Sequence, residues 1–254
     1  MSRPDNVGRM FQGSLDIDIQ NGLEFGVFTE EKPDPSQNYI DRLKPLAELS
    51  DWEFDQLFFD DKARRLSEVH WTPVRVAKRA AELLSGGPKS RILDVGSGAG
   101  KFCLVGALST DAQFFGVERR QALADYSRSL IKRQGVPRVS IIDGDASDLD
   151  WGLFDGIYLF NPFYENLVDV IRFEPLVELS LDRFNEYVRI TRTKLRDLKP
   201  GTRVVTYHGF GGELPCGYRL DQEYRFSRGT LQLWIKEAAH VNLEISPIVW
   251  QEPG

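Results

Sequence analysis

One glycine-rich run carries the clearest chemical information in this sequence. Residues 91–100 read RILDVGSGAG, an apolar strand pattern that reaches a carboxylate and then alternates glycine with small residues. Glycine is needed where a backbone turns sharply and a ligand touches the main chain. A strand, a glycine-rich turn and a helix in this order form the nucleotide-binding end of a doubly wound α/β sheet. We therefore expect a nucleotide-binding turn here, with a helix that begins at about Ala99.

The spacing of the glycines excludes two common nucleotide-binding loops. A dinucleotide loop needs G-x-G-x-x-G, but its third glycine position holds Lys101. A phosphate-binding P-loop needs G-x-x-x-x-G-K-[ST], but Val95 and Phe102 stand at its first glycine and at its hydroxyl. The remaining pattern, D-x-G-x-G-x-G, resembles the first motif of the class I S-adenosylmethionine (SAM)-dependent methyltransferases. The resemblance implies that the methionine end of SAM is held by Asp94 and the turn residues Gly96, Ser97, Gly98 and Gly100.

Two later strand ends carry acids in the order that this family shows. The apolar run 113–118 ends in Glu118, about 20 residues past the turn, where an acid can accept hydrogen bonds from both ribose hydroxyls. The run 139–142 leads into Gly144-Asp145-Ala146, which resembles the motif whose Asp faces the adenine amino group. The resemblance thus implies cofactor contacts by Glu118, Arg119, Asp145 and Ala146.

The fourth strand pattern, residues 154–160, delivers Asn161-Pro162-Phe163-Tyr164 to the edge where ligands bind in parallel sheets. This resembles the Asn/Asp-Pro-Pro-aromatic motif of methyltransferases that act on amino groups. The resemblance implies that Asn161 both contacts the cofactor and orients the acceptor nitrogen, with Pro162 and Tyr164 shaping the pocket. Phe163 replaces the second proline, which favours a protein side chain or small-molecule amine over a flat nucleobase. Glu165 and His208 are each either a base or a solvated loop residue.

The elements that position these residues form a recognisable series. Strand and helix patterns alternate from residue 91 to about 206, where Leu198-Lys199-Pro200-Gly201 precedes a fifth strand. Two extended runs, 218–226 and 230–236, follow and are joined by Ser227-Arg228-Gly229, a hairpin pattern. The link 208–215 is too short and glycine-rich for a helix. We predict an α/β fold, a doubly wound seven-stranded and mostly parallel sheet with an antiparallel C-terminal hairpin and an N-terminal helical extension.

The N-terminal part divides into an arm with short helices, residues 1–70, and a SAM-binding domain, residues 71–254. Helical patterns cover 39–50 and 52–59, either packed on the domain or acting as a lid. Thr72 is the expected N-cap of the next helix, with Pro73 at its first position. A Thr-Pro turn before the SAM motif also resembles a pre-motif that implies a contact of Thr72 with the cofactor. The apolar segment 165–181 is either a substrate cap or a core helix.

The composition of the chain limits the kinds of partner that we expect. The chain has 254 residues and a formal net charge of -6, which disfavours bulk nucleic acid because phosphate contacts need a basic surface. Two cysteines and three scattered histidines predict neither a disulfide framework nor a metal site. The apolar stretches are strand-sized and no signal-peptide pattern is present, so we expect a cytoplasmic protein without a membrane partner.

The leading interpretation is a SAM-dependent methyltransferase that modifies a nitrogen of a protein side chain or a small-molecule amine. An aminopropyl transferase is a second use of this fold, although Asn161-Pro162-Phe163 lacks the acidic loop that such enzymes carry. A SAM-binding module without transfer activity is a third. The oligomeric state is left open by the sequence.

Overall fold

The computed structural model describes residues 50–58, 63–64, 67, 71–163 and 180–238. Tyr164, Glu165, all but the last residue of the predicted helix 39–50 and nearly all of the apolar segment 165–181 lie outside the described residues. All described residues belong to one compact unit, 38–254. The proposed domain division at residue 70 stays a prediction.

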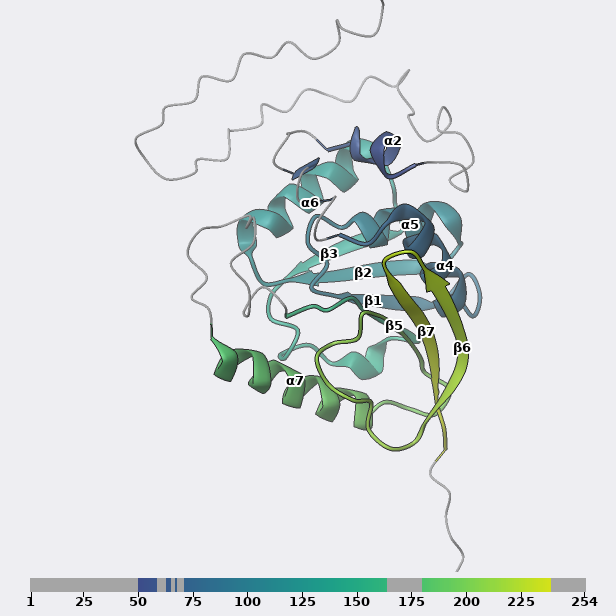
Figure 1. Cartoon of the computed structure of the whole chain (residues 1–254). Helices are drawn as coiled ribbons and strands as arrows, with labels where there is room; N and C mark the ends of the chain where they lie inside the picture. Colours follow the sequence, from purple (N-terminus) through teal and green to yellow (C-terminus); the bar gives the residue numbers. More distant parts are fainter. Residues whose placement is uncertain (1–49, 59–62, 65–66, 68–70, 164–179, 239–254) are drawn as a thin grey trace, which may run out of the picture. The chain divides into compact units, whose positions relative to one another are not determined.

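Seven strands of the described residues form one sheet in the order β3-β2-β1-β4-β5-β7-β6 (Figure 1). β1 to β5 run parallel, and β7 is antiparallel to both β5 and β6. The predicted fold class is confirmed. The strands are β1 (Arg91–Val95), β2 (Gln113–Glu118), β3 (Val139–Asp143), β4 (Gly156–Leu159), β5 (Arg203–Tyr207), β6 (Tyr218–Phe226) and β7 (Gly229–Lys236).

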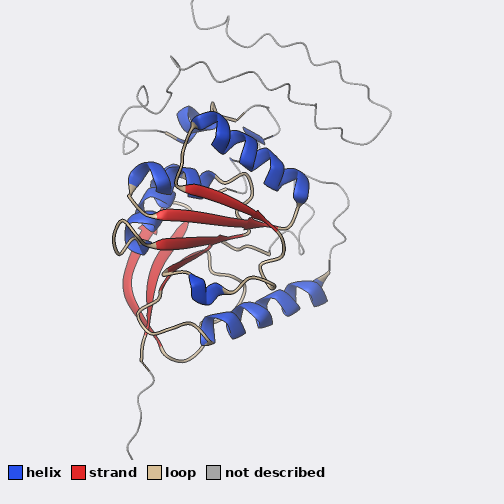
Figure 2. Cartoon of the chain, turned by 180° about the vertical axis from the view of Figure 1, so that it is seen from behind, coloured by secondary structure: helices blue, strands red, loops and turns tan. Residues whose placement is uncertain are grey.

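Helices cover both faces of the sheet (Figure 2). One face carries α4 (Val74–Leu84), α5 (Lys101–Ser109) and α6 (Gln121–Gln134), and the other carries α7 (Leu181–Arg196) with the short 3-10 helix η2 (Trp151–Leu153). α4 buries an apolar face against the sheet, since Ala77, Ala80, Ala81 and Leu84 are inaccessible to solvent. On the second face, Phe184 and Leu195 of α7 join a core cluster with residues of β1, β4 and β5.

The start of α4 corrects one prediction. Pro73 occupies the N-cap position and caps nothing with its side chain, so Thr72 is not the N-cap. The first helical N–H, of Val74, instead donates to Asp51 Oδ1 at 2.8 Å, a cap that comes from a distant segment. The Thr72 hydroxyl is buried beside the Tyr158 hydroxyl of β4, 2.9 Å away. α5 likewise begins at Lys101 rather than at Ala99, because Gly100 takes a left-handed conformation as its N-cap.

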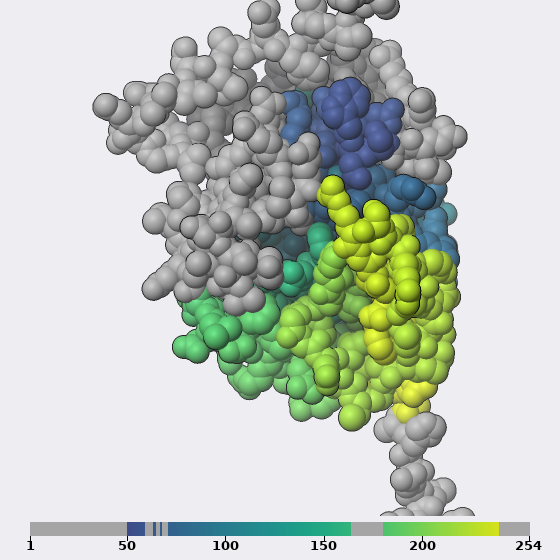
Figure 3. All heavy atoms as spheres, viewed as in Figure 1, coloured from purple at the N-terminus to yellow at the C-terminus, as the bar shows by residue number. Residues whose placement is uncertain are grey.

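Of the N-terminal helical patterns, the second is partly described. α2 (Asp51–Asp55) is shorter than the predicted run 52–59 and begins with a capping box, in which Ser50 and Glu53 bond to each other's backbone N–H. Figure 3 shows the atoms of α2, in purple, on the same face of the molecule as the β6–β7 hairpin, in yellow-green.

The predicted hairpin is confirmed, but its glycine is needed for packing and not for the turn itself. Phe226 pairs directly with Gly229, so the turn consists of Ser227 and Arg228, and Gly229 is already the first residue of β7. A Cβ at Gly229 would lie 2.4 Å from the His208 ring. Glycine therefore makes room for a side chain from the end of β5. The link from β5 to β6 contains no helix, as predicted.

The sheet register brings the functional positions to a common edge. Val95 pairs with Val117 of β2 and with Leu159 of β4, while Glu118 pairs with Asp143 of β3. Because these strands are parallel, the residues that follow their carboxyl ends meet at one edge of the sheet.

Candidate functional site

The glycine turn after β1 is tied to the end of β2. The N–H groups of Gly96 and Ser97 both donate to the Val117 carbonyl at 3.0 Å, and the Gly98 N–H donates to Glu118 Oε2 at 3.0 Å. The side chain of Ser97 is buried against Gly116 of β2, since a Cβ at Gly116 would lie 2.5 Å from its hydroxyl. The turn is therefore a fixed part of the sheet edge.

Two aromatic or cyclic side chains approach this turn closely. A Cβ at Gly98 would lie 3.1 Å from the indole nitrogen of Trp71, and one at Gly96 would lie 3.2 Å from Pro162. Gly98 also has a φ of +56°, a conformation that residues with a Cβ rarely adopt. The turn thus contacts the segment before α4 at Gly98 and the loop after β4 at Gly96.

Glu118 is buried and its carboxylate is fully engaged. The Arg120 guanidinium and backbone N–H donate to it, at 2.8 to 3.1 Å, in addition to the Gly98 N–H. Burial acts to raise the pKa of Glu118, but the charge and hydrogen bonds of Arg120 outweigh it and lower the pKa. These four hydrogen bonds occupy the four lone-pair positions of a carboxylate. A ligand hydroxyl must replace a bond from Arg120 to reach Glu118.

Asp145 is engaged in a similar way. It accepts hydrogen bonds from the Ser147 N–H at 2.9 Å and from the hydroxyl of Tyr187 on α7. Burial acts to raise the pKa of Asp145, but the hydrogen bonds from Tyr187 and Ser147 lower it. Burial and the Asp145 contact raise the pKa of Tyr187 to about 12. The Tyr187 ring stacks on Phe163, with centroids 4.8 Å apart.

These groups surround a cavity at the carboxyl ends of β1 to β4, which we call the strand-end cavity. Its volume is about 30 Å³, room for one water molecule. The sequence-predicted residues that line it are Gly96, Glu118, Arg119, Asp145, Ala146 and Pro162. Sequence reasoning assigned no ligand contact to its other lining residues, which are Val117, Arg120, Gly144, Phe163 and Tyr187.

Six predicted cofactor residues do not line this cavity, and they are Thr72, Asp94, Ser97, Gly98, Gly100 and Asn161. Asp94 is 4% exposed and accepts a hydrogen bond from the Cys103 thiol at 3.6 Å. Burial, with a smaller contribution from the charge of Glu118, raises the pKa of Asp94 to about 7. The carboxylate of Asp94 therefore changes charge near neutral pH.

Asn161 and His208 have an unusual backbone at the ends of β4 and β5. Their φ angles are +42° and +59°, and within the described ranges no other non-glycine residue has a positive φ. Asn tolerates this region better than most residues, and strained backbone clusters at functional sites. The Asn161 N–H donates to the Gly209 carbonyl at 2.8 Å, which joins the two strand ends. The exposed His208 ring lies against the Tyr207 ring and the hairpin at Gly229.

A second cavity, of about 320 Å³, lies beside β5 and β7 and the loop that follows β5. Its lining includes Thr206, Phe210, Tyr218 and Trp234, and none of the sequence-predicted site residues contributes to it. The larger of the two cavities is therefore not the one that the sequence-predicted site residues line.

The comparison with protein families matches the part of the chain that carries the cofactor motifs up to Asp145. Residues 40–151 match the family Protein-L-isoaspartate(D-aspartate) O-methyltransferase (PCMT), less than half of the sequence. Among curated proteins, none matches the chain.

Solved structures of three bacterial proteins resemble this one. An RNA methyltransferase from Salinibacter ruber, in complex with S-adenosylhomocysteine, is 21% identical over 71% of this chain and 99% of its own, with a TM-score of 0.49. The putative methyltransferase yhhF from Escherichia coli is 14% identical over 65% and 87%, with a TM-score of 0.47. TrmN from Thermus thermophilus is 17% identical over 73% and 52%, with a TM-score of 0.49.

The strand order, with β7 antiparallel between β5 and β6, decides the fold. The chain has the class I methyltransferase fold. The resemblance stated from the sequence motifs is confirmed at this level. Identities this low do not transfer the acceptor of any of these proteins to this methyltransferase-fold chain, so neither RNA nor any other acceptor follows from them.

Two searches concern the described residues alone. No described helix of this methyltransferase-fold chain is long and apolar enough to span a membrane. No described group of three or more His, Cys, Asp or Glu side chains is arranged to bind a metal ion.

The sequence offers little signal for the missed lining residues. Tyr187 lies 42 positions from Asp145, on a helix whose pattern indicates only an amphipathic element. Arg120 is two residues from Glu118, so an ion pair was open to local reasoning. Phe163 was noted as a departure from the family motif and lies in the cavity wall.

Proposed function

We propose that this protein is a SAM-dependent methyltransferase that binds its cofactor along the glycine turn and the strand-end cavity. The observation that carries the proposal is that residues at the carboxyl ends of four different strands, Gly96, Glu118, Asp145 and Pro162, line one cavity. These are the positions that the motif resemblance assigns to cofactor and acceptor. A turn that only packed would not require acids at the two following strand ends.

The chemistry of the donor set fits SAM. The lowered pKa values of Glu118 and Asp145 keep both carboxylates ionised at neutral pH, able to accept hydrogen bonds from ribose hydroxyls and an adenine amino group. Asp94 would face the cationic methionine end, where a positive charge favours its ionised form. Bound SAM supplies an electrophilic methyl group on a sulfonium, and the protein's contribution is mainly positioning.

The acceptor is proposed to be an amine of a protein side chain or small molecule, oriented by Asn161. The strained backbone of Asn161 and its bond to Gly209 fix the residue at the edge where β4 and β5 end. Pro162, which contacts the turn at Gly96, would bring this loop against the cofactor. Tyr164 remains part of the proposal and lies outside the described residues.

A carboxylate acceptor is the second candidate, favoured by the PCMT match. That match ends at residue 151, before β4 and Asn161, so it covers the cofactor half of the site and not the acceptor half. We therefore rank methyl ester formation below N-methylation.

The test is transfer from methyl-labelled SAM to a cell lysate that is then separated into protein, nucleic acid and small molecules. Methyl esters release methanol in mild alkali, whereas N-methyl groups keep their label. Alkali-stable label in protein or small molecules supports the proposal, and alkali-labile protein label favours the second candidate. Label in RNA would contradict the amine acceptor, and absence of transfer would favour a binding module.

Asn161→Gly tests the catalytic residue without adding strain at a positive φ. We expect kcat to fall by about 100-fold, because the acceptor loses its orientation. The dissociation constant of S-adenosylhomocysteine, measured by calorimetry, should change less than about threefold. Asn161→Asp is the matched control, since Asp also tolerates a positive φ and keeps a side-chain oxygen, as in the Asn/Asp-Pro-Pro-aromatic motif. Full activity of Asn161→Gly would remove Asn161 from the mechanism.

A further inference from the structure

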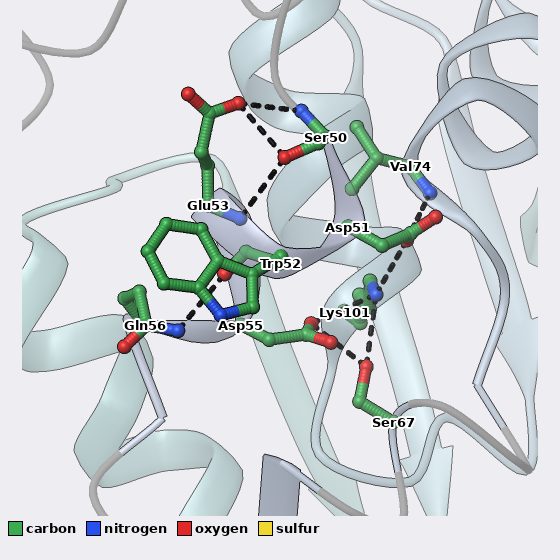
Figure 4. Close-up of polar contacts among 9 residues, drawn as sticks. All are labelled: Ser50, Asp51, Trp52, Glu53, Asp55, Gln56, Ser67, Val74 and Lys101. Atoms are coloured by element: carbon green, nitrogen blue, oxygen red, sulfur yellow. Dashed lines mark hydrogen bonds and ion pairs between the residues drawn. The ribbon is translucent and has the colours of Figure 1, made fainter.

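A buried ammonium group lies next to the glycine turn and takes no part in the strand-end cavity. Lys101, the first residue of α5, is 2% exposed. Its Nζ donates hydrogen bonds at 2.8 Å to Asp51, Asp55 and Ser67, as Figure 4 shows. Ser67 in turn donates to Asp55 at 2.8 Å. We call these four residues the Lys101 cluster.

The position of the Lys101 ammonium group is energetically unfavourable unless acidic partners are present. The N-terminus of a helix carries a partial positive charge, and a cation there is repelled rather than attracted. Burial of an ammonium group is costly unless it is paired and hydrogen-bonded. Asp55 is also buried, at 5% exposure, while Asp51 is about half exposed. The pairing with α2 is therefore what permits a lysine at this point of the turn.

Two short chains of contacts lead from the cluster to the segment before α4, and the first of them reaches the glycine turn. In the first, the Ser67 carbonyl accepts a hydrogen bond from the Trp71 N–H at 3.4 Å, and the Trp71 indole lies against Gly98. Phe58, which follows α2, packs edge-on against Trp71 with centroids 4.9 Å apart. The residue pair thus links the segment that follows α2 to the side chain that lies against the turn.

The second chain passes through the start of α4. Asp51 accepts from Lys101 and from the Val74 N–H with the same oxygen, so one carboxylate joins α5 to α4. Thr72, two residues before Val74, is buried on Tyr158 of β4. The cluster therefore fixes both ends of the Trp71–Val74 segment.

We propose that Lys101 is a positioning residue, which docks α2 and thereby holds Trp71 against the glycine turn and Thr72 against Tyr158, so that the cofactor site is complete only when α2 is docked. This rests on the proposed function, because it assigns Trp71 to the wall beside bound SAM. It differs from a purely structural ion pair in one respect. Cofactor binding and α2 docking stabilise each other, since coupling between two sites is reciprocal.

The variant that tests the proposal is Lys101→Met, which keeps the length of the side chain and removes the charge. The matched control is Lys199→Met, whose ammonium forms an ion pair with Asp155 in which both side chains are about half exposed. Below the melting temperature of either variant, we expect Lys101→Met to raise the dissociation constant of S-adenosylhomocysteine at least tenfold. Lys199→Met should bind like the unmodified protein. Unchanged affinity in a folded Lys101→Met protein overturns the proposal.

Amide hydrogen exchange of the unmodified protein keeps the proposal testable if Lys101→Met does not fold. We expect saturating S-adenosylhomocysteine to slow exchange at residues 51–58 and 71–74 at least threefold, with the hairpin turn 227–229 unaffected as an internal control. Binding of the ligand without any slowing in 51–58 overturns this inference alone. Absence of binding overturns the proposed function, and the inference with it.

Discussion

Both acids of the strand-end cavity are occupied by side chains of the protein itself. Arg120 holds Glu118 and the Tyr187 hydroxyl holds Asp145, and each interaction lowers the pKa of the acid it contacts. The same contacts keep the carboxylates ionised and oriented at the cavity wall. They also compete with any ligand donor, because Arg120 and Tyr187 already occupy the hydrogen-bonding positions that groups of the proposed cofactor would take.

Tyr187→Phe separates these two effects. Phe keeps the stacking on Phe163 but removes the hydroxyl that occupies Asp145. We expect SAM to bind about three- to tenfold more tightly, because it no longer displaces a hydrogen bond whose net value is about 1 kcal/mol. Calorimetric titration measures the change, with Tyr187→Ala as a comparison that also loses the ring. Weaker binding by Tyr187→Phe would mean that the hydroxyl contacts the cofactor directly.

Among the elements, α5 packs closely on the sheet at Gly106. A Cβ at Gly106 would lie 2.3 Å from the ring of Phe114 in β2, so this helix packs with its backbone almost on a buried aromatic side chain. The helix begins at Lys101, directly after the glycine turn. A shift of α5 would therefore move the turn and the Lys101 cluster together.

Gly106→Ala tests this packing against helix propensity. Alanine favours a helix over glycine by about 1 kcal/mol, but the added methyl group overpacks Phe114. We expect a net loss of about 2 kcal/mol in the free energy of unfolding, measured by urea denaturation. Gly86→Ala, in the bend after α4 and not in a helix, controls for the added methyl group alone, since its nearest neighbour would be 3.5 Å away and its φ is not positive. Equal stabilities for the two variants would show that Phe114 yields easily.

At the scale of the whole molecule, the sheet edge could be predicted from the sequence and the contacts across it could not. Parallel strands align their carboxyl ends, so a carboxylate or glycine turn after each apolar run predicts a shared site. The two acidic partners of Lys101, Asp55 and Asp51, are 46 and 50 positions away in the sequence, so no local pattern predicts these contacts. Thr72 was wrongly expected to cap α4, because a propensity argument sees neighbours in sequence, whereas Asp51 supplies the cap from another element.

The pH dependence of overall stability offers a further prediction. Burial raises the pKa of Asp94 to about 7 in the folded protein, whereas the unfolded chain releases this proton near the ordinary aspartate pKa of 3.8. Between these values the native state binds more protons, so stability falls as pH rises. From pH 5 to pH 8, the unfolding free energy should fall by about 3 kcal/mol more than in Asp94→Asn. Denaturant titrations at both pH values measure this difference, and equal falls would contradict the raised pKa.

The place of β7 has a consequence for how the chain is made. β7 is the last of the described strands in sequence, yet it lies between β5 and β6 in the sheet. During synthesis on the ribosome, the edge of β5 that pairs with β7 therefore stays unpaired until residue 236 has emerged. The nascent chain passes through a stage with four parallel strands already paired to one another on one side of β5 and a row of open backbone groups on the other. An open edge of this kind is a template for pairing with another chain. The hairpin turn, which forms locally and fast, shortens that stage.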